Sequence, residues 1–467
     1  MTTIIVVGGG YVGLITSACF ARLGHKVFCL ENDPARVQAL REGRLPIREP
    51  GLPEIWEQGI ESGQLEVSSS YKESVRSSDF VFIAVGTPPK ANGAADLRQV
   101  VSAVRSIVGA VNGGTMPTVI VKSTVPPGTA EVVKSLISEY RPHETPRVVS
   151  NPEFLREGLA VIDFMRPSRI VLGADDPDTS RAAGELYANL RRPVIYTSNR
   201  AAEMIKYASN AFLATKISFM NEIAGLCEEI GVDVVDISKA LGMDSRIASS
   251  YLDAGLGWGG SCLPKDVSGL IWTANRVGVA TPILSAAVKI NNRQGWLAVG
   301  KLKDVIGDLR GKTIAIWGLA FKPNCDDVRE SQSLHLVRHL VSEGASVRAF
   351  DPVAMEQAAR HYPEIEYASD AYEAATGADA LVLATAWPQF LTLDLHKVRS
   401  LMRRPLLLDA RNALNVKTVT DAGLVYLGIG RPMSGPEFAQ EPKELAQHLH
   451  GSRRPRQASR GNGRRIA

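Results

Sequence analysis

In the first part of the chain, short apolar runs alternate with longer stretches of helical spacing. Runs rich in valine and isoleucine predict buried parallel strands at 3–8, 26–31, 80–86, 118–123, 147–150 and 169–173. Strands that alternate with helices in this order form βαβ units. The pattern therefore predicts an α/β fold with a doubly wound parallel sheet over residues 1–196.

The strand pattern then gives way to helical periodicity. Residues 200–230 predict one long helix that ends near Gly231, and further helices follow to about residue 292, broken by a glycine-rich loop at 255–260. From residue 312 short apolar runs return, at 312–317, 346–351, 380–385, 406–409 and 424–427, with an amphipathic helix at 331–343. We therefore expect two Rossmann-like sheets joined by a long central helix and a helical connector.

This pattern divides the chain into a first sheet domain (1–196), a central helical part (197–300), a second sheet domain (301–450) and a tail (451–467). Hydrophobic residues make up 45% and charged residues 22%, which is ordinary for a globular chain. The formal net charge of +4 is due to the tail, which holds six arginines and no acidic residue. Nothing in the body therefore indicates a nucleic acid partner, and the tail is expected to be disordered and solvated.

The sequence carries no sign of secretion or of a membrane anchor. The apolar residues at 3–7 follow no basic stretch and run straight into glycines, which is typical of a strand and not of a signal peptide. No apolar run reaches 18 residues, so no membrane span is predicted. The five cysteines form no CxxC pair, which argues against disulfides or a metal site and favours a protein of the reducing cytoplasm.

A dinucleotide-binding turn follows the first predicted strand. Gly8, Gly10 and Gly13 form a GxGxxG motif, with Tyr11 and Val12 between the last two glycines. Such glycines allow a tight turn, close approach of the backbone to a pyrophosphate, and close helix packing. The helix that begins near Tyr11 would offer free N–H groups to the phosphates. The motif is specific here because it follows a strand and opens a helix.

The residue that ends the next strand indicates which dinucleotide binds. Glu31 can accept hydrogen bonds from ribose hydroxyls and would repel a 2′-phosphate, so the sequence favours NAD over NADP. Arg36 could approach the adenosine side or be a surface arginine. The second predicted sheet has a G-L-A-F-K turn at 318–322 without the glycine fingerprint, so a second NAD site is not expected.

The segment G-W-G-G-S-C-L-P-K-D at 257–266 carries the most informative cysteine. Glycines let the backbone approach a ligand closely. A thiolate is the reactive form of Cys262, and a nearby cation or helix start lowers a thiol pKa, so Lys265 and Asp266 are placed to tune it. The alternative is a small buried cysteine in a tight turn.

Three further segments hold polar groups where ligands bind in such folds. The N-P-E-F-L-R-E-G run at 151–158 follows a strand, at the sheet edge where ligands bind. Ser123 and Thr124 close another strand. Lys206 and Asn210 share one face of the long helix, where the lysine either reaches the surface or belongs to a site.

The chain resembles the UDP-glucose/GDP-mannose dehydrogenase family over about residues 1–435. The motifs that carry this resemblance occur in family order and spacing, at 8–13, 49–51, 86–88, 123–128, 151–158, 202–206, 259–266 and 321–331. The resemblance implies that Cys262 is the catalytic nucleophile and that Glu153 assists proton transfer, with Thr124 helping to hold a water. It also implies that Lys206, Asn210 and Asp266 orient water and stabilise an oxyanion.

The resemblance extends to the ligand contacts. For the sugar nucleotide it implies Glu153, Phe154, Leu155, Arg156, Lys206, Asn210, Arg246, Tyr251, Gly259, Lys322 and Arg411. For the NAD cofactor it implies, besides the 8–13 turn with Glu31 and Arg36, the residues Thr87, Thr124, Glu157, Lys265 and Arg329.

The implied reaction is the oxidation of a primary alcohol to a carboxylate, which requires two hydride transfers and so two NAD. A thiolate can add to the intermediate aldehyde, and the resulting thiohemiacetal can be oxidised to a thioester that water hydrolyses. A cationic lysine would stabilise the developing oxyanion. The resemblance also implies a homodimer built on the long helix, with Arg246 reaching into the partner's site unless it is a helix-end surface arginine.

Within the family the sequence favours UDP-glucose as the substrate. The loop at 244–248 resembles the UDP-glucose branch, whereas Leu263-Pro264 resembles the GDP-mannose branch, so GDP-mannose stays open as a second candidate substrate. Ser261 argues against the UDP-N-acetylhexosamine branch. Two rival functions also stay open: a two-electron hydroxyacid dehydrogenase, and a nucleotide-sensing protein without turnover.

Overall fold

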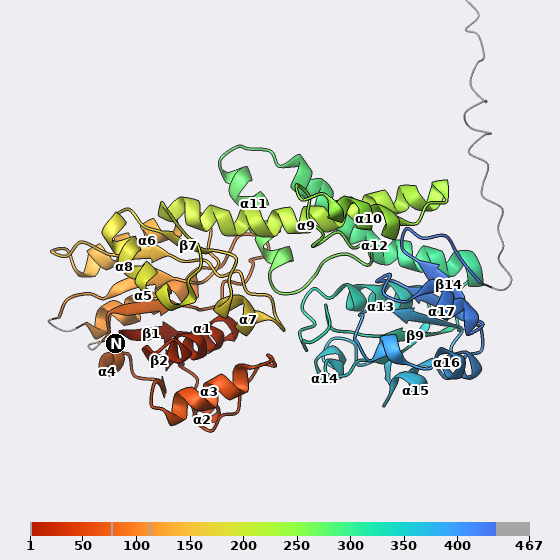
Figure 1. Ribbon diagram of the computed structural model, residues 1–467, viewed down its shortest axis with the longest axis horizontal. Coiled ribbons are helices and arrows are strands. Elements are labelled where there is room, and N and C mark those ends of the chain that lie inside the picture. Colours follow the sequence, from red (N-terminus) through yellow and green to blue (C-terminus); the bar gives the residue numbers. More distant parts are fainter. Residues whose placement is uncertain (1, 76–77, 112–113, 436–467) are drawn as a thin grey trace, which may run out of the picture.

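The computed structural model describes residues 2–75, 78–111 and 114–435. Two α/β units lie side by side, and one long helix, α9 (Asn199–Ile230), runs across the top of both (Figure 1). The basic tail at 451–467 lies outside the described residues. The expected fold class, two mostly parallel sheets with a helical connector between them, is confirmed.

The first sheet has eight strands in the order β3-β2-β1-β4-β5-β6-β7-β8. Their bounds are β1 (Thr3–Val7), β2 (Lys26–Leu30), β3 (Leu65–Ser68), β4 (Phe80–Ile83), β5 (Thr118–Val121), β6 (Val148–Ser150), β7 (Ile170–Gly173) and β8 (Val194–Thr197). Strands β6 and β7 pair antiparallel, so the expectation that all six predicted strands run parallel is wrong at this junction. The sequence pattern also missed β3 and β8.

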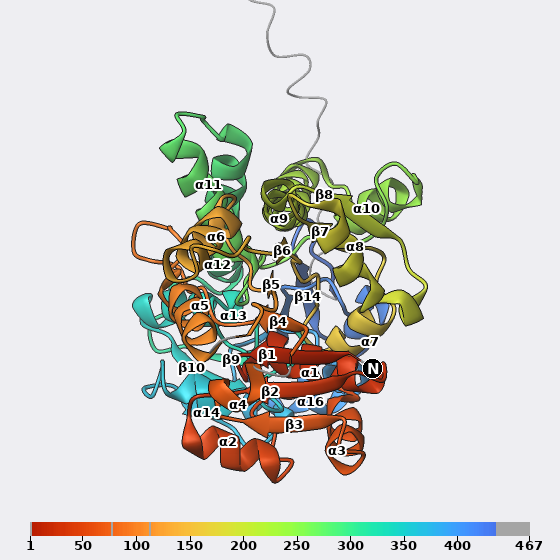
Figure 2. The same ribbon diagram turned by 90° about the vertical axis from the view of Figure 1, so that its left-hand side faces the viewer.

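Helices cover both faces of this sheet. They are α1 (Tyr11–Arg22), α2 (Pro34–Arg41), α3 (Leu52–Glu61), α4 (Tyr71–Val75), α5 (Arg98–Ala110), α6 (Thr129–Tyr140), α7 (Ala160–Met165) and α8 (Pro177–Glu185). Figure 2 shows α5 and α6 on one side and α1, α3, α7 and α8 on the other. Alternate residues of β1 enter the two cores, Ile4 and Val6 on one face and Ile5 and Val7 on the other. This two-sided burial explains the continuous apolar runs.

The connector consists of α9, α10 (Val234–Met243), α11 (Leu263–Arg276) and α12 (Pro282–Ile306). The hydroxyl of Ser198 caps the start of α9, and Gly231 ends it in the left-handed conformation. The prediction of one long helix ending near Gly231 is confirmed. Both α11 and α12 pack along α9, which brings the cysteine loop before α11 to the side of the long helix.

The second sheet has six strands in the order β11-β10-β9-β12-β13-β14. Their bounds are β9 (Thr313–Trp317), β10 (Ser346–Phe350), β11 (Glu366–Tyr367), β12 (Ala380–Leu383), β13 (Leu406–Asp409) and β14 (Val425–Gly428). Its helices are α13 (Gln332–Ser342), α14 (Met355–Ala359), α15 (Ala371–Ala375), α16 (Leu395–Leu401) and α17 (Val416–Asp421). All five predicted strands and the amphipathic helix are present, and only the two-residue β11 was missed.

Candidate active site

A cavity of about 830 Å³ lies where the first sheet, α9, the cysteine loop and the loop at 318–331 meet. Eleven residues that the sequence proposed for the site line it: Glu153, Phe154, Leu155, Arg156, Glu157, Lys206, Asn210, Tyr251, Gly259, Cys262 and Lys322. These residues come from four separate stretches of the chain. The fold therefore gathers most of the proposed chemistry into one space.

An ion pair between two buried side chains lies in this cavity. Lys206 Nζ is 3.0 Å from Glu153 Oε1, and each side chain is 5% exposed. The Leu155 N–H donates to the other carboxylate oxygen at 2.6 Å. Burial alone would raise the pKa of Glu153, but the Lys206 ammonium and the Leu155 N–H outweigh it and hold the pKa below its ordinary value. Glu153 is therefore an ionised carboxylate in a water-poor site.

Cys262 directly precedes α11 and is partly exposed toward the cavity. Burial and the Glu153 carboxylate raise the pKa of its thiol above the ordinary value, and the Lys206 ammonium opposes them only in part. The expected lowering of the thiol pKa by Lys265 is wrong, because the lysine that acts on the thiol is Lys206. Lys265 is instead ion-paired with Asp266. The resting thiol is thus protonated at neutral pH.

Asp266 holds the polar groups of α9 and α11 together from behind the cavity. Its carboxylate has no exposed surface and accepts a hydrogen bond from Asn210 Nδ2 at 2.5 Å. Asn210 lies one turn after Lys206 on α9, so both side chains face α11. Asp266 itself does not line the cavity, and its contact with Asn210 fixes the amide that does.

The glycines of the cysteine loop are required by close packing against the second unit. A methyl group on Gly259 would lie 2.1 Å from the carbonyl oxygen of Glu330. Gly260 has φ +83°, and a methyl group there would lie 2.7 Å from the ring of Phe321. The Gly260 N–H also donates to the Arg329 carbonyl at 3.0 Å. The second unit therefore shapes the loop that carries Cys262.

Lys122 is a cavity residue that the sequence reasoning missed. It directly follows β5, is 5% exposed, and donates from Nζ to Asn151 Oδ1 at 3.0 Å. No carboxylate lies within ion-pair distance of it in the described part of the chain, and burial lowers its pKa to about 8. The signal was present in the sequence, since a lysine ended the apolar run predicted as a buried strand.

The glycine-rich turn has the shape that a dinucleotide needs. Gly8 has φ +110°, and a methyl group on it would lie 2.6 Å from the Ala84 carbonyl oxygen. A methyl group on Gly13 would lie 1.8 Å from the Gly8 carbonyl oxygen, so the helix can approach the turn only with glycine there. Nothing lies within 4 Å of that position on Gly10, so the space in front of the start of α1 is open. The turn therefore fits a pyrophosphate held by N–H groups.

Other proposed cofactor residues gather around this turn. Glu31 accepts the Gly9 N–H at 3.2 Å and lies 3.4 Å from the guanidinium of Arg36, which is thus its partner. The Thr87 hydroxyl donates to the Thr124 carbonyl at 2.7 Å. These two threonines follow the neighbouring strands β4 and β5, which places them at one sheet edge.

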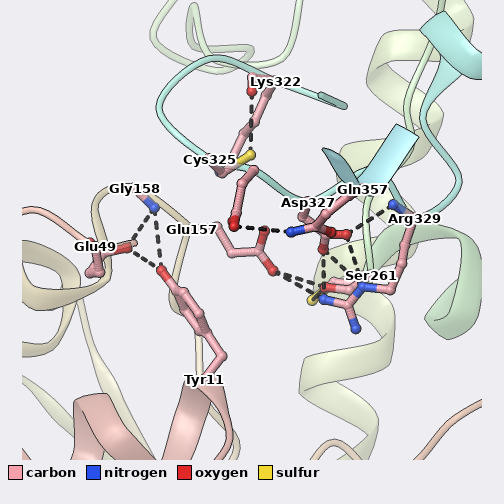
Figure 3. Close-up of polar contacts among 12 residues, drawn as sticks. Tyr11, Glu49, Glu157, Gly158, Ser261, Lys322, Cys325, Asp327, Arg329 and Gln357 are labelled. Carbon is pink, nitrogen blue, oxygen red and sulfur yellow. Dashed lines mark hydrogen bonds and ion pairs between the residues drawn. The ribbon is translucent and has the colours of Figure 1, made fainter. Parts of the chain in front are cut away.

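Glu157 links the first sheet to the rest of the site (Figure 3). Its carboxylate accepts a hydrogen bond from Ser261 Oγ at 3.0 Å and lies 3.9 Å from the guanidinium of Arg329. Burial and Asp327 raise its pKa. Arg329 is held mainly by Asp327, at 2.6 Å. The proposed residues Glu157 and Arg329 are therefore brought together at the rim of the cysteine loop.

Two proposed substrate residues do not line the cavity. The side chain of Arg246 is 87% exposed and pairs with Asp244 at 2.6 Å. Arg411 donates to the Ala384 carbonyl at 2.6 Å and to the Gly257 carbonyl at 3.2 Å, and burial lowers its pKa to about 10. Arg411 thus ties β13 to the cysteine loop.

Two searches of the described residues found nothing. None of the helices there is both long and apolar enough to cross a membrane. No group of three or more histidine, cysteine, aspartate or glutamate side chains in those ranges could hold a metal ion.

Models of the UDP-glucose/GDP-mannose dehydrogenase family match this chain in three parts. They are the NAD binding domain over residues 2–191, the central domain over 200–293 and the UDP binding domain over 315–416.

Among known proteins, a UDP-glucose 6-dehydrogenase of Rhizobium meliloti is 44% identical over 92% of this chain and 99% of its own. The structure of a UDP-glucose dehydrogenase from Pyrobaculum islandicum covers 92% of this chain and 98% of that chain, with 40% identity and a TM-score of 0.87. A GDP-mannose dehydrogenase from Pseudomonas aeruginosa covers 91% of this chain and 99% of that chain, at 32% identity and a TM-score of 0.52.

Proposed function

This chain belongs to the UDP-glucose/GDP-mannose dehydrogenase family, and we propose that it oxidises the C6 alcohol of UDP-glucose to the carboxylate of UDP-glucuronate through Cys262. The observation that carries this proposal is the position of Cys262 in one cavity with the buried Lys206–Glu153 pair and Asn210. A two-electron alcohol oxidation needs no nucleophilic thiol, whereas continuing to a carboxylate does. Bound NAD supplies the hydride acceptor for each of the two oxidations, giving two NADH per sugar.

The side chains divide the remaining work by their charge. Cys262 loses its proton as its sulfur forms a bond with the aldehyde carbon, and Glu153 is the ionised base in the same cavity that can accept that proton. The carbonyl oxygen becomes an oxyanion, which the Lys206 ammonium and the Asn210 amide stabilise. In the last step water attacks the thioester carbon, the carbon–sulfur bond breaks, and the thiolate of Cys262 leaves.

UDP-glucose is proposed over GDP-mannose because of the likeness to known proteins. The Rhizobium meliloti relative is named for UDP-glucose, and the Pyrobaculum islandicum UDP-glucose dehydrogenase has the higher TM-score of the two structures compared. The Leu263-Pro264 pair, which resembles the GDP-mannose branch, begins α11 behind the cysteine and is compatible with either sugar. The roles given to individual site residues are part of this proposal.

We also propose that two copies associate along α9. Three large apolar side chains recur at every seventh residue of this helix: Phe212, Phe219 and Leu226, which are 65%, 49% and 57% exposed. We call them the α9 stripe. Exposed apolar side chains at heptad spacing are typical of a helix that packs against another. Phe212 also lines the cavity, so a partner on the stripe would border the site. A monomer by light scattering at assay concentration would refute this association.

The experiment that tests the activity counts NADH per sugar consumed, with UDP-glucose and GDP-mannose in parallel. We expect two NADH per UDP-glucose and a carboxylate product. In Cys262→Ala no carboxylate should form, because no thiol can capture the aldehyde. Cys227→Ala, which removes a buried cysteine far along α9, is the matched control and should keep the yield of two. One NADH per sugar with Cys262→Ala still active would overturn the proposal.

A further inference from the structure

The buried carboxylate of Glu49 joins two segments that belong to different ligand sites. Glu49 lies just before α3 and is 4% exposed. It accepts the N–H groups of Gly158 and Ala160, each at 2.7 Å, and the hydroxyl of Tyr11 (Figure 3). None of the ion pairs in the described ranges involves it, so these donors are what makes its burial tolerable.

The donors come from the two edges of the catalytic space. Tyr11 is the first residue of α1, inside the glycine-rich turn, while Gly158 closes the loop that carries Glu153, Phe154 and Leu155. The Gly158 N–H also lies 3.3 Å from the Tyr11 hydroxyl, so the three groups form one compact cluster. Burial and Glu49 raise the pKa of Tyr11 far above its ordinary value, which keeps its hydroxyl a donor at neutral pH.

The same loop is held on its other side by the second unit. Gly158 has φ +79°, and a methyl group on it would lie 3.1 Å from the carbonyl oxygen of Asn324. Its neighbour Glu157 accepts the Ser261 hydroxyl. Lys322, two residues before Asn324, lines the cavity. The loop at 153–158 therefore has little freedom to move unless its contact with Tyr11 and Glu49 moves as well.

We propose that Tyr11 and Glu49 are positioning residues that couple the cofactor turn to the sugar-nucleotide loop, so that each ligand tightens the binding of the other. A pyrophosphate at the start of α1 fixes the main chain of Tyr11, and its hydroxyl then fixes the Glu49 carboxylate and the Gly158 N–H. The coupling rests on the proposed function, because that function places the sugar nucleotide on this loop.

The test uses two ligands that lack the groups meeting at the reaction centre: ADP-ribose, without nicotinamide, and UDP, without sugar. Titration calorimetry gives the affinity for ADP-ribose with and without saturating UDP. In the unmodified chain we expect UDP to tighten ADP-ribose about fivefold or more, within the usual range of coupling between sites. In Tyr11→Phe and in Glu49→Gln the ratio should fall to about one, because the link between turn and loop is lost.

Two comparisons separate this coupling from general damage. The affinity of Tyr11→Phe for ADP-ribose alone should stay within about threefold of the original, since the variant keeps the ring and the turn glycines. The double variant should lose no more coupling than either single variant, because both residues act in one link. Tyr140→Phe removes a hydroxyl that is exposed on α6 and should leave the ratio unchanged.

The proposal is overturned by either of two results: an unmodified chain without coupling between ADP-ribose and UDP, or a Tyr11→Phe variant that keeps the original ratio. Failure of the proposed function gives a different result. A chain that couples the two ligands but forms no NADH from UDP-glucose would sink the activity and leave the coupling standing.

Discussion

The two sheet units have the same strand–turn start but differ in what occupies the turn. After β1, the carboxylate of Glu31 takes a single N–H of the turn, that of Gly9, and α1 begins at once with its N–H groups free for a ligand. After β9, the carboxylate of Asp351 takes the N–H groups of Leu319 and Ala320, at 2.7 and 3.0 Å. In the second unit an anion belonging to the protein sits where the first unit keeps room for a phosphate.

The path after the turn differs as well. In the first unit the helix starts within four residues of the strand, whereas in the second unit α13 starts only at Gln332 and the intervening loop carries Lys322 and Arg329 to the cavity. A turn that has given up a phosphate is free to lead into a longer loop. The comparison teaches that the two units share a topology but divide the tasks, one for cofactor cradling and one for completing the site.

The largest effect is expected from Asp351→Ala. The Asp351 carboxylate is fully buried and accepts four main-chain N–H groups and the indole N–H of Trp387. Its loss leaves buried donors without acceptors, so the free energy of unfolding should fall by about 3–5 kcal/mol in a denaturant titration.

The matched change in the first unit is Glu31→Ala. Glu31 lies at a half-open turn that water can reach, so we expect a loss of about 1 kcal/mol or less from this change. Equal losses from Asp351→Ala and Glu31→Ala would break the distinction between an internal anion and an open turn.

An intermediate effect is expected from Gly13→Ala. The added methyl group would meet the Gly8 carbonyl oxygen at 1.8 Å and push α1 from the turn, so NADH affinity should fall at least about tenfold, the cost of overpacking by 1–3 kcal/mol. Fluorescence titration of NADH measures it. Gly109→Ala on α5 is the control, because nothing lies within 4 Å of its methyl position, and it should bind NADH normally. Unchanged binding in Gly13→Ala would mean that the turn is not the cofactor cradle.

The smallest effect is expected from Glu31→Gln. A neutral amide forms weaker hydrogen bonds to ribose hydroxyls than a carboxylate does, so NADH affinity should fall about fivefold, or roughly 1 kcal/mol. The preference for NADH over NADPH should shrink in the same titration, since the repulsion of a 2′-phosphate is removed. Asp351→Asn should alter neither affinity, and a loss of NADH binding there would contradict the assignment of the cofactor to the first unit alone.

The sequence predicted most of the fold because buried parallel strands are apolar on both faces. The strands it missed lack that property: β8 is half-exposed, and β11 is only two residues long. The site residues carried by motifs were found through their chemistry. Lys122 was missed because the apolar run absorbed it, and the pKa direction of Cys262 was wrong because burial depends on packing. Contacts such as Glu157 to Ser261, 104 residues apart, exist only once the units are docked.

The packing of Gly259 and Gly260 against Glu330 and Phe321 also governs when the chemistry first arises in a newly made chain. Domains generally fold in order of synthesis from the N-terminus. The cofactor turn and Cys262 are therefore complete before the segment at 321–330 that shapes the cysteine loop has been made. A half-synthesised chain can hold its dinucleotide cradle without a shaped thiol site, so reactivity toward aldehydes is the last property that the maturing protein gains.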